Sequence, residues 1–153
     1  MHVEDRLSEL GLTLPVAAAP AANYVPYIIC QGVVHISGQL PMADGSLTFQ
    51  GKVGQNISED NAIKAAQLCG LNIIAQLKAA CDGDLGRVQR IILLGGFVNC
   101  VDGFEKQPAI INGASDLMVA AFGERGRHAR AAVGTNALPF NAPVEIDAIA
   151  FID

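Results

Sequence analysis

Two periods of hydrophobic residues run along this chain and predict its secondary structure. Between residues 144 and 152 apolar residues occupy every second position, whereas Glu145 and Asp147 fall between them. A period of two is typical of a strand with one buried face. Further strands are expected at 27–30, 33–37, 47–49, 88–101 and 129–135, with Gln31-Gly32 as a tight turn between the first two.

The second period, three to four residues, predicts two long helices. One runs from Ser58, a natural N-cap, to about Cys81, and Gly70 in its apolar stripe indicates close backbone packing. The other runs from Pro108 to Phe122 and ends at Gly123. Residues 5–10 favour a short helix, followed by an extended arm.

The predicted order of elements is β-β-β-α-β-α-β-β within a single α+β domain, residues 1–153, with 1–23 as the N-terminal helix and arm. Two helices can cover only one face of so wide a sheet. The other face carries Ile149 and Phe151 beside Glu145, so we expect it to pack against other subunits.

Composition narrows the class of protein. Hydrophobic residues make up 51% of the chain and the net charge is −5, which favours oligomerisation and disfavours a nucleic-acid partner. The polar start and the proline-containing Leu14–Ala22 stretch predict neither a signal peptide nor a membrane span, hence a cytoplasmic protein.

The chain offers no signature of a metal or cofactor site. Its cysteines lie in apolar stretches without a C-x-x-C pair, so buried free thiols are expected at Cys30, Cys69, Cys81 and Cys100. No glycine pattern matches a nucleotide-binding loop. We predict no metal and no cofactor.

Arg130 is the first candidate for chemistry. It lies in the run Ala129-Arg130-Ala131-Ala132-Val133, whose small neighbours leave a hollow above the guanidinium. A planar, permanently charged fork in a hollow matches a carboxylate or a phosphate. A structural Arg130–Glu145 ion pair is the alternative at this point.

Five segments in register resemble the RidA/YjgF family, the reactive intermediate imine deaminases, also called L-PSP endoribonucleases or translation inhibitors. They are Pro26-Tyr27, Ile36-Ser37-Gly38-Gln39-Leu40-Pro41, Val98, Asn112 and the C-terminal stretch from Ala129 to Ala150. The resemblance covers nearly the whole of residues 24–151.

The resemblance implies a chorismate-mutase-like fold with a mixed sheet, two helices on one face, and a homotrimeric barrel with clefts between subunits. It implies that Arg130 binds the carboxylate of a small-molecule substrate and that Glu145 acts on the hydrolytic water. By the same resemblance Tyr27, Ser37 and Asn112 line the cleft. The implied substrates are 2-aminoacrylate and related imines.

A protonated imine is already a reactive electrophile. The enzyme therefore needs only to bind it, to position a water molecule near its carbon and to supply a base. Glu145, if near a cation, should be ionised and able to orient water. Ala132 and Ser115 depart from the short members, where cysteine and an aromatic residue are frequent. The N-terminal arm is also longer, which resembles the longer branch of the family.

Several of these residues have plainer interpretations from the sequence alone. Ser37 can simply bond the backbone, Tyr27 can belong to the core, and Asn112 can be an ordinary polar residue on a helix. His35 and His128 are expected to be structural or solvated. Arg125 and Arg127, with His128, are expected to form a solvated cluster after the second helix.

Three functions remain open at this point. The first is hydrolysis of 2-imino acids to 2-keto acids and ammonia. The second is non-catalytic binding of a 2-keto acid or related carboxylate in the same cleft, as in a regulatory protein. The third, disfavoured by the acidic balance and the absence of Trp, is ribonuclease activity or translation inhibition.

Overall fold

One mixed sheet of five strands forms the framework, in the order β1-β2-β7-β5-β6, in a computed structural model that describes residues 2–19 and 22–153. The parallel pair is β5–β6, and the other neighbouring strands are antiparallel. The α+β, mixed-sheet prediction is therefore confirmed. The strands are β1 Tyr27–Cys30, β2 Val33–Gln39, β5 Val88–Asn99, β6 Ala129–Thr135 and β7 Val144–Ile152.

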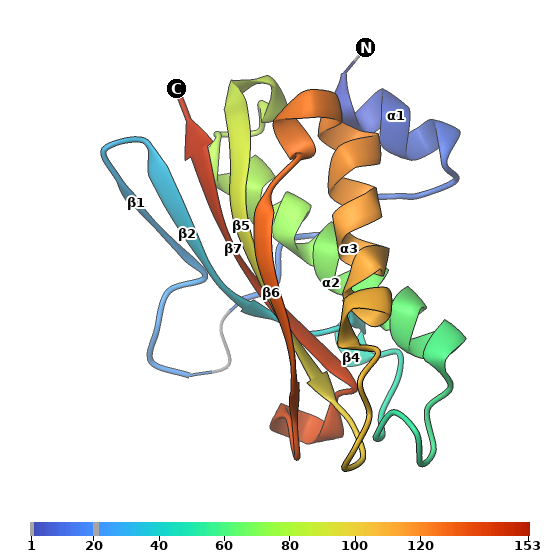
Figure 1. Ribbon diagram of the computed structural model, residues 1–153. Coiled ribbons are helices and arrows are strands. Elements are labelled where there is room, and N and C mark those ends of the chain that lie inside the picture. Colours follow the sequence, from blue (N-terminus) through green and yellow to red (C-terminus); the bar gives the residue numbers. More distant parts are fainter. Residues whose placement is uncertain (1, 20–21) are drawn as a thin grey trace.

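Helices cover one face of this sheet and leave the other open (Figure 1). They are α1 Val3–Glu9, α2 Glu59–Ala80 and α3 Gln107–Phe122. The Ser58 hydroxyl accepts the Asn61 N–H at the start of α2, and Gly123 ends α3 with a φ of 63°. Both long helices thus begin and end within a residue of the predicted bounds.

The core lies between the two long helices and the sheet. The alternate residues of β7 from Val144 to Ile152 are buried, as expected from the period of two. Gly70 of α2 lies against α3, since a Cβ there would be 3.4 Å from the Ala114 Cα atom. The close packing inferred for this glycine is confirmed.

The third strand predicted at 47–49 forms only in part. Strand β4 covers Ser46–Leu47 and pairs with β3 Met42–Ala43 in a small separate hairpin. Asp44 and Gly45 between them both have positive φ, 51° and 80°, the geometry of a tight hairpin turn. This hairpin lies outside the five-stranded sheet. Short 3-10 segments follow elsewhere: η1 Leu85–Arg87, η2 Gly123–Gly126 and η3 Pro139–Asn141.

One cysteine also departs from expectation. Cys69, Cys81 and Cys100 are buried free thiols, but Cys30 is exposed because β1 is an edge strand with its outer positions uncovered.

The open face of the sheet is rich in apolar side chains. Ile28 and Phe151 are 60% and 41% exposed, and Phe97 and Val133 are also exposed, in register with Glu145 across β5 and β6. Exposed apolar clusters of this kind mark interaction surfaces. In the described part of the chain no helix is long and apolar enough to span a membrane.

Candidate active site

Arg130 projects from the edge strand β6 onto α3. It is in register with Leu94 of β5, which is buried under the helices, so the Arg130 side chain leaves the sheet on the helix-covered face. Its Nη1 donates to Asn112 Oδ1 at 2.8 Å and to Ser115 Oγ at 3.1 Å. Its Nη2 donates to the Pro108 carbonyl at 3.3 Å. The helix α3 therefore fixes the guanidinium through neutral oxygen atoms alone.

No acidic side chain neutralises this guanidinium. Of the ion pairs formed within residues 2–19 and 22–153, none includes Arg130. The guanidinium is half-buried and lines a cavity of about 250 Å³ together with Ser115, Asp116 and His128. A positioned, uncompensated cation beside a cavity is suited to binding an anion.

Glu145 lies on the opposite, open face of the sheet. It is in register with the exposed Phe97 and alternates along β7 with the buried residues that face the helices. The ion-pair alternative between Arg130 and Glu145 is therefore wrong within one chain, because β5 separates their strands and the two side chains leave different faces.

The electrostatic surroundings of Glu145 differ from expectation. Burial raises the pKa of its carboxyl above the ordinary 4.5, and the neighbouring Asp147 raises it further. The sequence-based expectation of an ionised Glu145 assumed a cation nearby, whereas the causes that shift its pKa within this chain are burial and Asp147. A carboxyl with a raised pKa is better placed to exchange protons near neutral pH.

Glycines make room for both carboxylates. A Cβ atom at Gly38 of β2 would collide with the Glu145 carboxylate, and one at Gly95 of β5 would collide with that of Asp147. A β-bulge between Ile36 and Gln39 brings Gly38 to this position. Burial likewise raises the pKa of Asp147, opposed by a hydrogen bond from the Gly95 backbone.

The remaining predicted residues fall into separate places. Asn112 joins Arg130, as described. Ser37 precedes Gly38 beside Glu145, and its hydroxyl donates to the Val25 carbonyl at 2.7 Å, which is the plainer role considered above. Tyr27 lies on β1 at the far edge of the sheet from β6 and packs partly against the core. One chain thus joins Arg130 to Asn112 and places Glu145 against Gly38, which follows Ser37, but it does not bring Arg130 and Glu145 together.

His128 is expected from the sequence to be structural or solvated, and its contacts fit a structural role. Its Nε2 lies 2.9 Å from Ser115 Oγ, the atom that also accepts from Arg130. The sequence did not indicate this link to Arg130. The available signal was Ser115 itself, a hydroxyl at a position where an aromatic residue is frequent in the family that the chain resembles.

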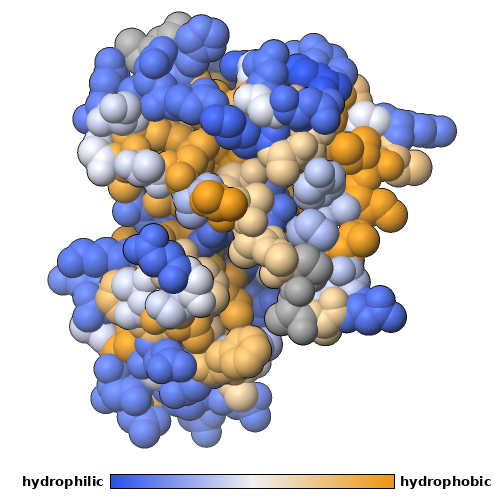
Figure 2. All heavy atoms as spheres, turned by 180° about the vertical axis from the view of Figure 1, so that it is seen from behind, coloured by the Kyte–Doolittle hydropathy of each residue, from blue (hydrophilic) through white to orange (hydrophobic). Residues whose placement is uncertain are grey.

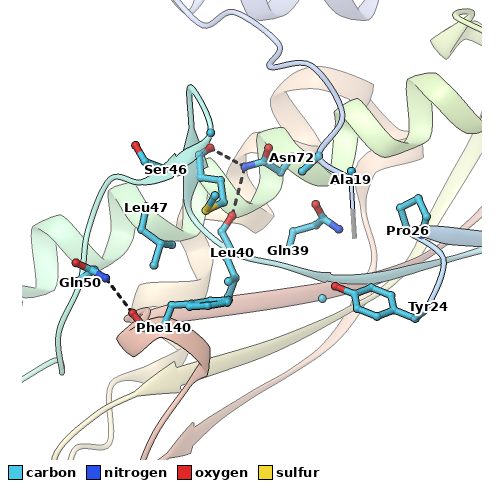
Figure 3. A pocket seen from close by; sticks show the side chains of 14 residues that line it. Ala19, Tyr24, Pro26, Gln39, Leu40, Ser46, Leu47, Gln50, Asn72 and Phe140 are labelled. Carbon is cyan, nitrogen blue, oxygen red and sulfur yellow. Dashed lines mark hydrogen bonds between the residues drawn. The ribbon is translucent and has the colours of Figure 1, made fainter. Parts of the chain in front are cut away.

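Sequence reasoning also missed a larger cavity of about 480 Å³ near Gly38 (Figure 3). Asn72 of α2 fixes the backbone that lines this cavity, because its Nδ2 donates to the Leu40 and Met42 carbonyls at 3.3 and 3.0 Å. Seen from behind, the surface shows a hollow with apolar atoms between two lobes (Figure 2). Buried amides in an apolar helix, at Asn72 and Gln76, were the available signal.

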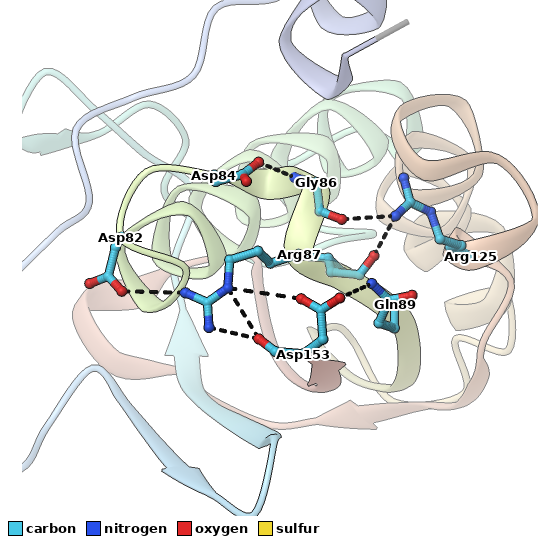
Figure 4. A network of polar contacts seen from close by, with 8 residues as sticks. Asp82, Asp84, Gly86, Arg87, Gln89, Arg125 and Asp153 are labelled. Carbon is cyan, nitrogen blue, oxygen red and sulfur yellow. Dashed lines mark hydrogen bonds and ion pairs between the residues drawn. The ribbon is translucent and has the colours of Figure 1, made fainter.

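The basic residues after α3 have structural partners. Arg125 donates to the Gly86 and Val88 carbonyls at 3.2 and 2.8 Å, next to the pairing of Arg87 with the C-terminal Asp153 (Figure 4). Arg127 pairs with Glu124 at 2.8 Å. Arg125 and Arg127 are therefore each engaged by partners within the chain.

Comparison with known proteins finds a matching family and similar proteins. Residues 4–150 match the family model described as "YjgF/chorismate mutase-like, putative endoribonuclease". Protein TCP17 of Trypanosoma cruzi is 47% identical over 150 residues, covering 97% of this chain and 92% of that protein.

Two solved structures show the same fold. The protein Atu1372 of Agrobacterium tumefaciens, described as of unknown function, has a TM-score of 0.94 and 54% identity, covering 99% of this chain and 92% of that one. RidA from the Antarctic bacterium Psychrobacter sp. PAMC 21119 has a TM-score of 0.61 and 25% identity, covering 92% and 96%.

Proposed function

Because this chain belongs to the YjgF/RidA, chorismate-mutase-like family, we propose that it hydrolyses reactive 2-imino acids and their enamine tautomers to 2-keto acids and ammonia. The observation that carries the proposal is Arg130, a guanidinium held by three neutral acceptors of α3 with no acid to neutralise it. Such a group binds the substrate carboxylate through paired, charge-assisted hydrogen bonds.

The site that we propose is shared by two subunits of a homotrimer. Arg130 and Asn112 of one subunit face Glu145 and Ser37 of the next. The open face, with Ile28, Phe97 and Phe151 exposed, supports this assembly because burying it against other copies removes apolar surface from water. The division of the predicted residues into two groups within one chain supports it as well.

In this arrangement each group has one task. Arg130 holds the carboxylate, so the imine carbon is fixed relative to the protein. Glu145, whose pKa is raised by burial and by Asp147, orients the attacking water. Gly38 leaves the space that the carboxylate occupies.

The direct test measures keto-acid formation from freshly generated 2-iminopropionate with the wild type and Arg130→Ala. We expect the wild type to exceed the spontaneous rate and the variant to fall toward that rate. Pyruvate binding by the wild type without any rate above the spontaneous one would favour the non-catalytic carboxylate binder instead.

Mixing variants tests whether the site is shared. Arg130→Ala and Glu145→Gln chains are each expected to be inactive as pure trimers. After joint refolding in equal amounts, roughly a quarter of the shared clefts combine an intact Arg130 with an intact Glu145 in a cyclic trimer. Recovery of roughly that fraction of the wild-type activity supports the shared cleft, and no recovery contradicts it.

A further inference from the structure

A directional chain of hydrogen bonds runs from Arg130 through Ser115 and His128 to the backbone. Arg130 Nη1 donates to Ser115 Oγ at 3.1 Å, and Ser115 Oγ lies 2.9 Å from His128 Nε2. His128 Nδ1 lies 2.6 Å from the Gly126 carbonyl oxygen. Since that carbonyl can only accept, Nδ1 carries the proton and donates it.

This contact fixes the tautomer of the neutral ring. With the proton on Nδ1, His128 Nε2 presents a lone pair, and the Ser115 hydroxyl donates to it. Ser115 Oγ meanwhile accepts from Arg130 and keeps one further lone pair. The hydroxyl that borders the Arg130 cavity therefore has a base directly behind it.

The arrangement has the parts of an acid–base pair. A hydroxyl, a histidine within hydrogen-bond reach, and a third group that orients the histidine are the recurring elements of proton transfer in hydrolytic sites. Here the third group is the Gly126 carbonyl, which also stabilises the imidazolium through the Nδ1–H contact. The guanidinium on Ser115 Oγ favours loss of the hydroxyl proton to His128.

Resting on the proposed function, we propose that Ser115 and His128 form the proton relay of the Arg130 site. Water adds to the carbon of the protonated imine, and the C=N π electrons move to nitrogen. One water proton passes to Ser115 Oγ as the Ser115 proton passes to His128 Nε2.

The relay then runs in reverse. The imidazolium returns its proton through Ser115 to the amine nitrogen of the carbinolamine. The C–N bond breaks with its electron pair on nitrogen, the carbonyl forms, and the hydroxyl proton leaves to the released ammonia.

Charged groups around His128 define the setting of the relay. Arg127, Arg130 and Asp116 line the same cavity as His128 and Ser115. Arg127 is already paired with Glu124. Asp116 lines the cavity without a hydrogen bond to Ser115 or His128 among the described residues. Arg130 is the charged group that contacts the relay, through Ser115.

The test compares His128→Gln and Ser115→Ala with matched controls, His2→Gln and Ser8→Ala, whose side chains are exposed on or beside α1. Both kcat/KM for 2-iminopropionate and the affinity for pyruvate are measured from pH 5 to pH 9. We expect the relay variants to lose about 10²-fold or more in kcat/KM, together with one ionisation of the wild-type pH profile. Pyruvate affinity at pH 7 should change by less than about threefold.

Two further variants separate chemistry from structure. Ser115→Thr keeps the hydroxyl and should retain most of the activity. His128→Ala should regain activity on addition of imidazole. A His128→Gln variant with the wild-type pH profile and rate, or one that loses pyruvate affinity and kcat/KM equally, would overturn the relay alone. A wild type without hydrolysis would overturn the relay together with the proposed function.

Discussion

Arg130 and Glu145 leave the same sheet on opposite faces, with strand β5 lying between their own strands. Arg130 points onto α3 and Glu145 onto the open face. One chain therefore cannot bring the two side chains to a common ligand, and any site that uses both must include a second subunit. This relationship shapes the predictions below.

Arg130→Lys tests whether two parallel hydrogen bonds matter or only charge. Lysine keeps the charge but presents a point donor in place of the planar fork. We expect the affinity for pyruvate to fall by about 10-fold to 100-fold, which corresponds to the loss of one charge-assisted hydrogen bond of roughly 1.5–3 kcal/mol. Isothermal titration calorimetry measures this change, and an unchanged affinity would contradict bidentate binding.

Gly38→Ala tests the placement of Glu145. The added methyl would collide with the Glu145 carboxylate, so the carboxylate must move or the bulge must shift. We expect a loss of hydrolysis that exceeds any loss of pyruvate affinity, and a free energy of unfolding reduced by about 1–3 kcal/mol. Gly45→Ala is the control for glycine removal on this side of the molecule, since open space surrounds its Cβ position, although its positive φ carries some strain.

Glu145→Gln is expected to change the pH dependence of stability. The pKa of Glu145 is raised in the folded chain, so the folded state holds its proton to a higher pH than the unfolded state. Stability contributed by this group is therefore present at acid pH and falls as pH rises above the ordinary value of 4.5. Glutamine carries no such dependence.

Urea denaturation at pH 4 and pH 7 measures this difference. The variant should gain stability relative to the wild type on going from pH 4 to pH 7, while losing hydrolysis. Asp147→Asn is a matched comparison, because burial also raises the pKa of Asp147. A variant that instead loses stability toward pH 7 would show that Glu145 is stabilised in its ionised form.

Asn72→Leu tests the wall of the larger cavity. Leucine has a similar size but donates nothing to the Leu40 and Met42 carbonyls, which Asn72 now satisfies. The Leu40 carbonyl keeps the Met42 N–H as a partner, so the Met42 carbonyl is the acceptor most affected. We expect the free energy of unfolding to fall by about 1 kcal/mol, the typical net contribution of a lost hydrogen bond. Thermal unfolding followed by circular dichroism provides the measurement, with Asn61→Ala on the exposed first turn of the same helix as the control.

Local signals predicted most elements well. The period of two in residues 144–152 and the N-cap at Ser58 depend only on neighbours in the chain, and both appear as expected. The strand predicted at 47–49 is shortened to Ser46–Leu47, because the turn at Asp44 and Gly45 pairs it with residues immediately before it. The turn selected the partner of this strand, and that partner lies outside the main sheet.

Local sequence signals predicted only part of the candidate site. Arg130 and Asn112 could be named from motifs, but their hydrogen bond depends on how α3 lies against β6. The contact of His128 with Ser115 joins residues of different elements, and neither residue type is unusual by itself.

The sequence alone determined which positions of each strand and helix are apolar, and therefore the order of the elements and the side of β7 on which Glu145 and Asp147 lie. The tertiary structure decided which polar groups meet: it placed Arg130 beside Ser115 and His128, and Glu145 beside Gly38 on the other face. The reason is physical. Backbone periodicity is set by neighbouring residues, whereas contacts between distant side chains depend on the register and packing of whole elements.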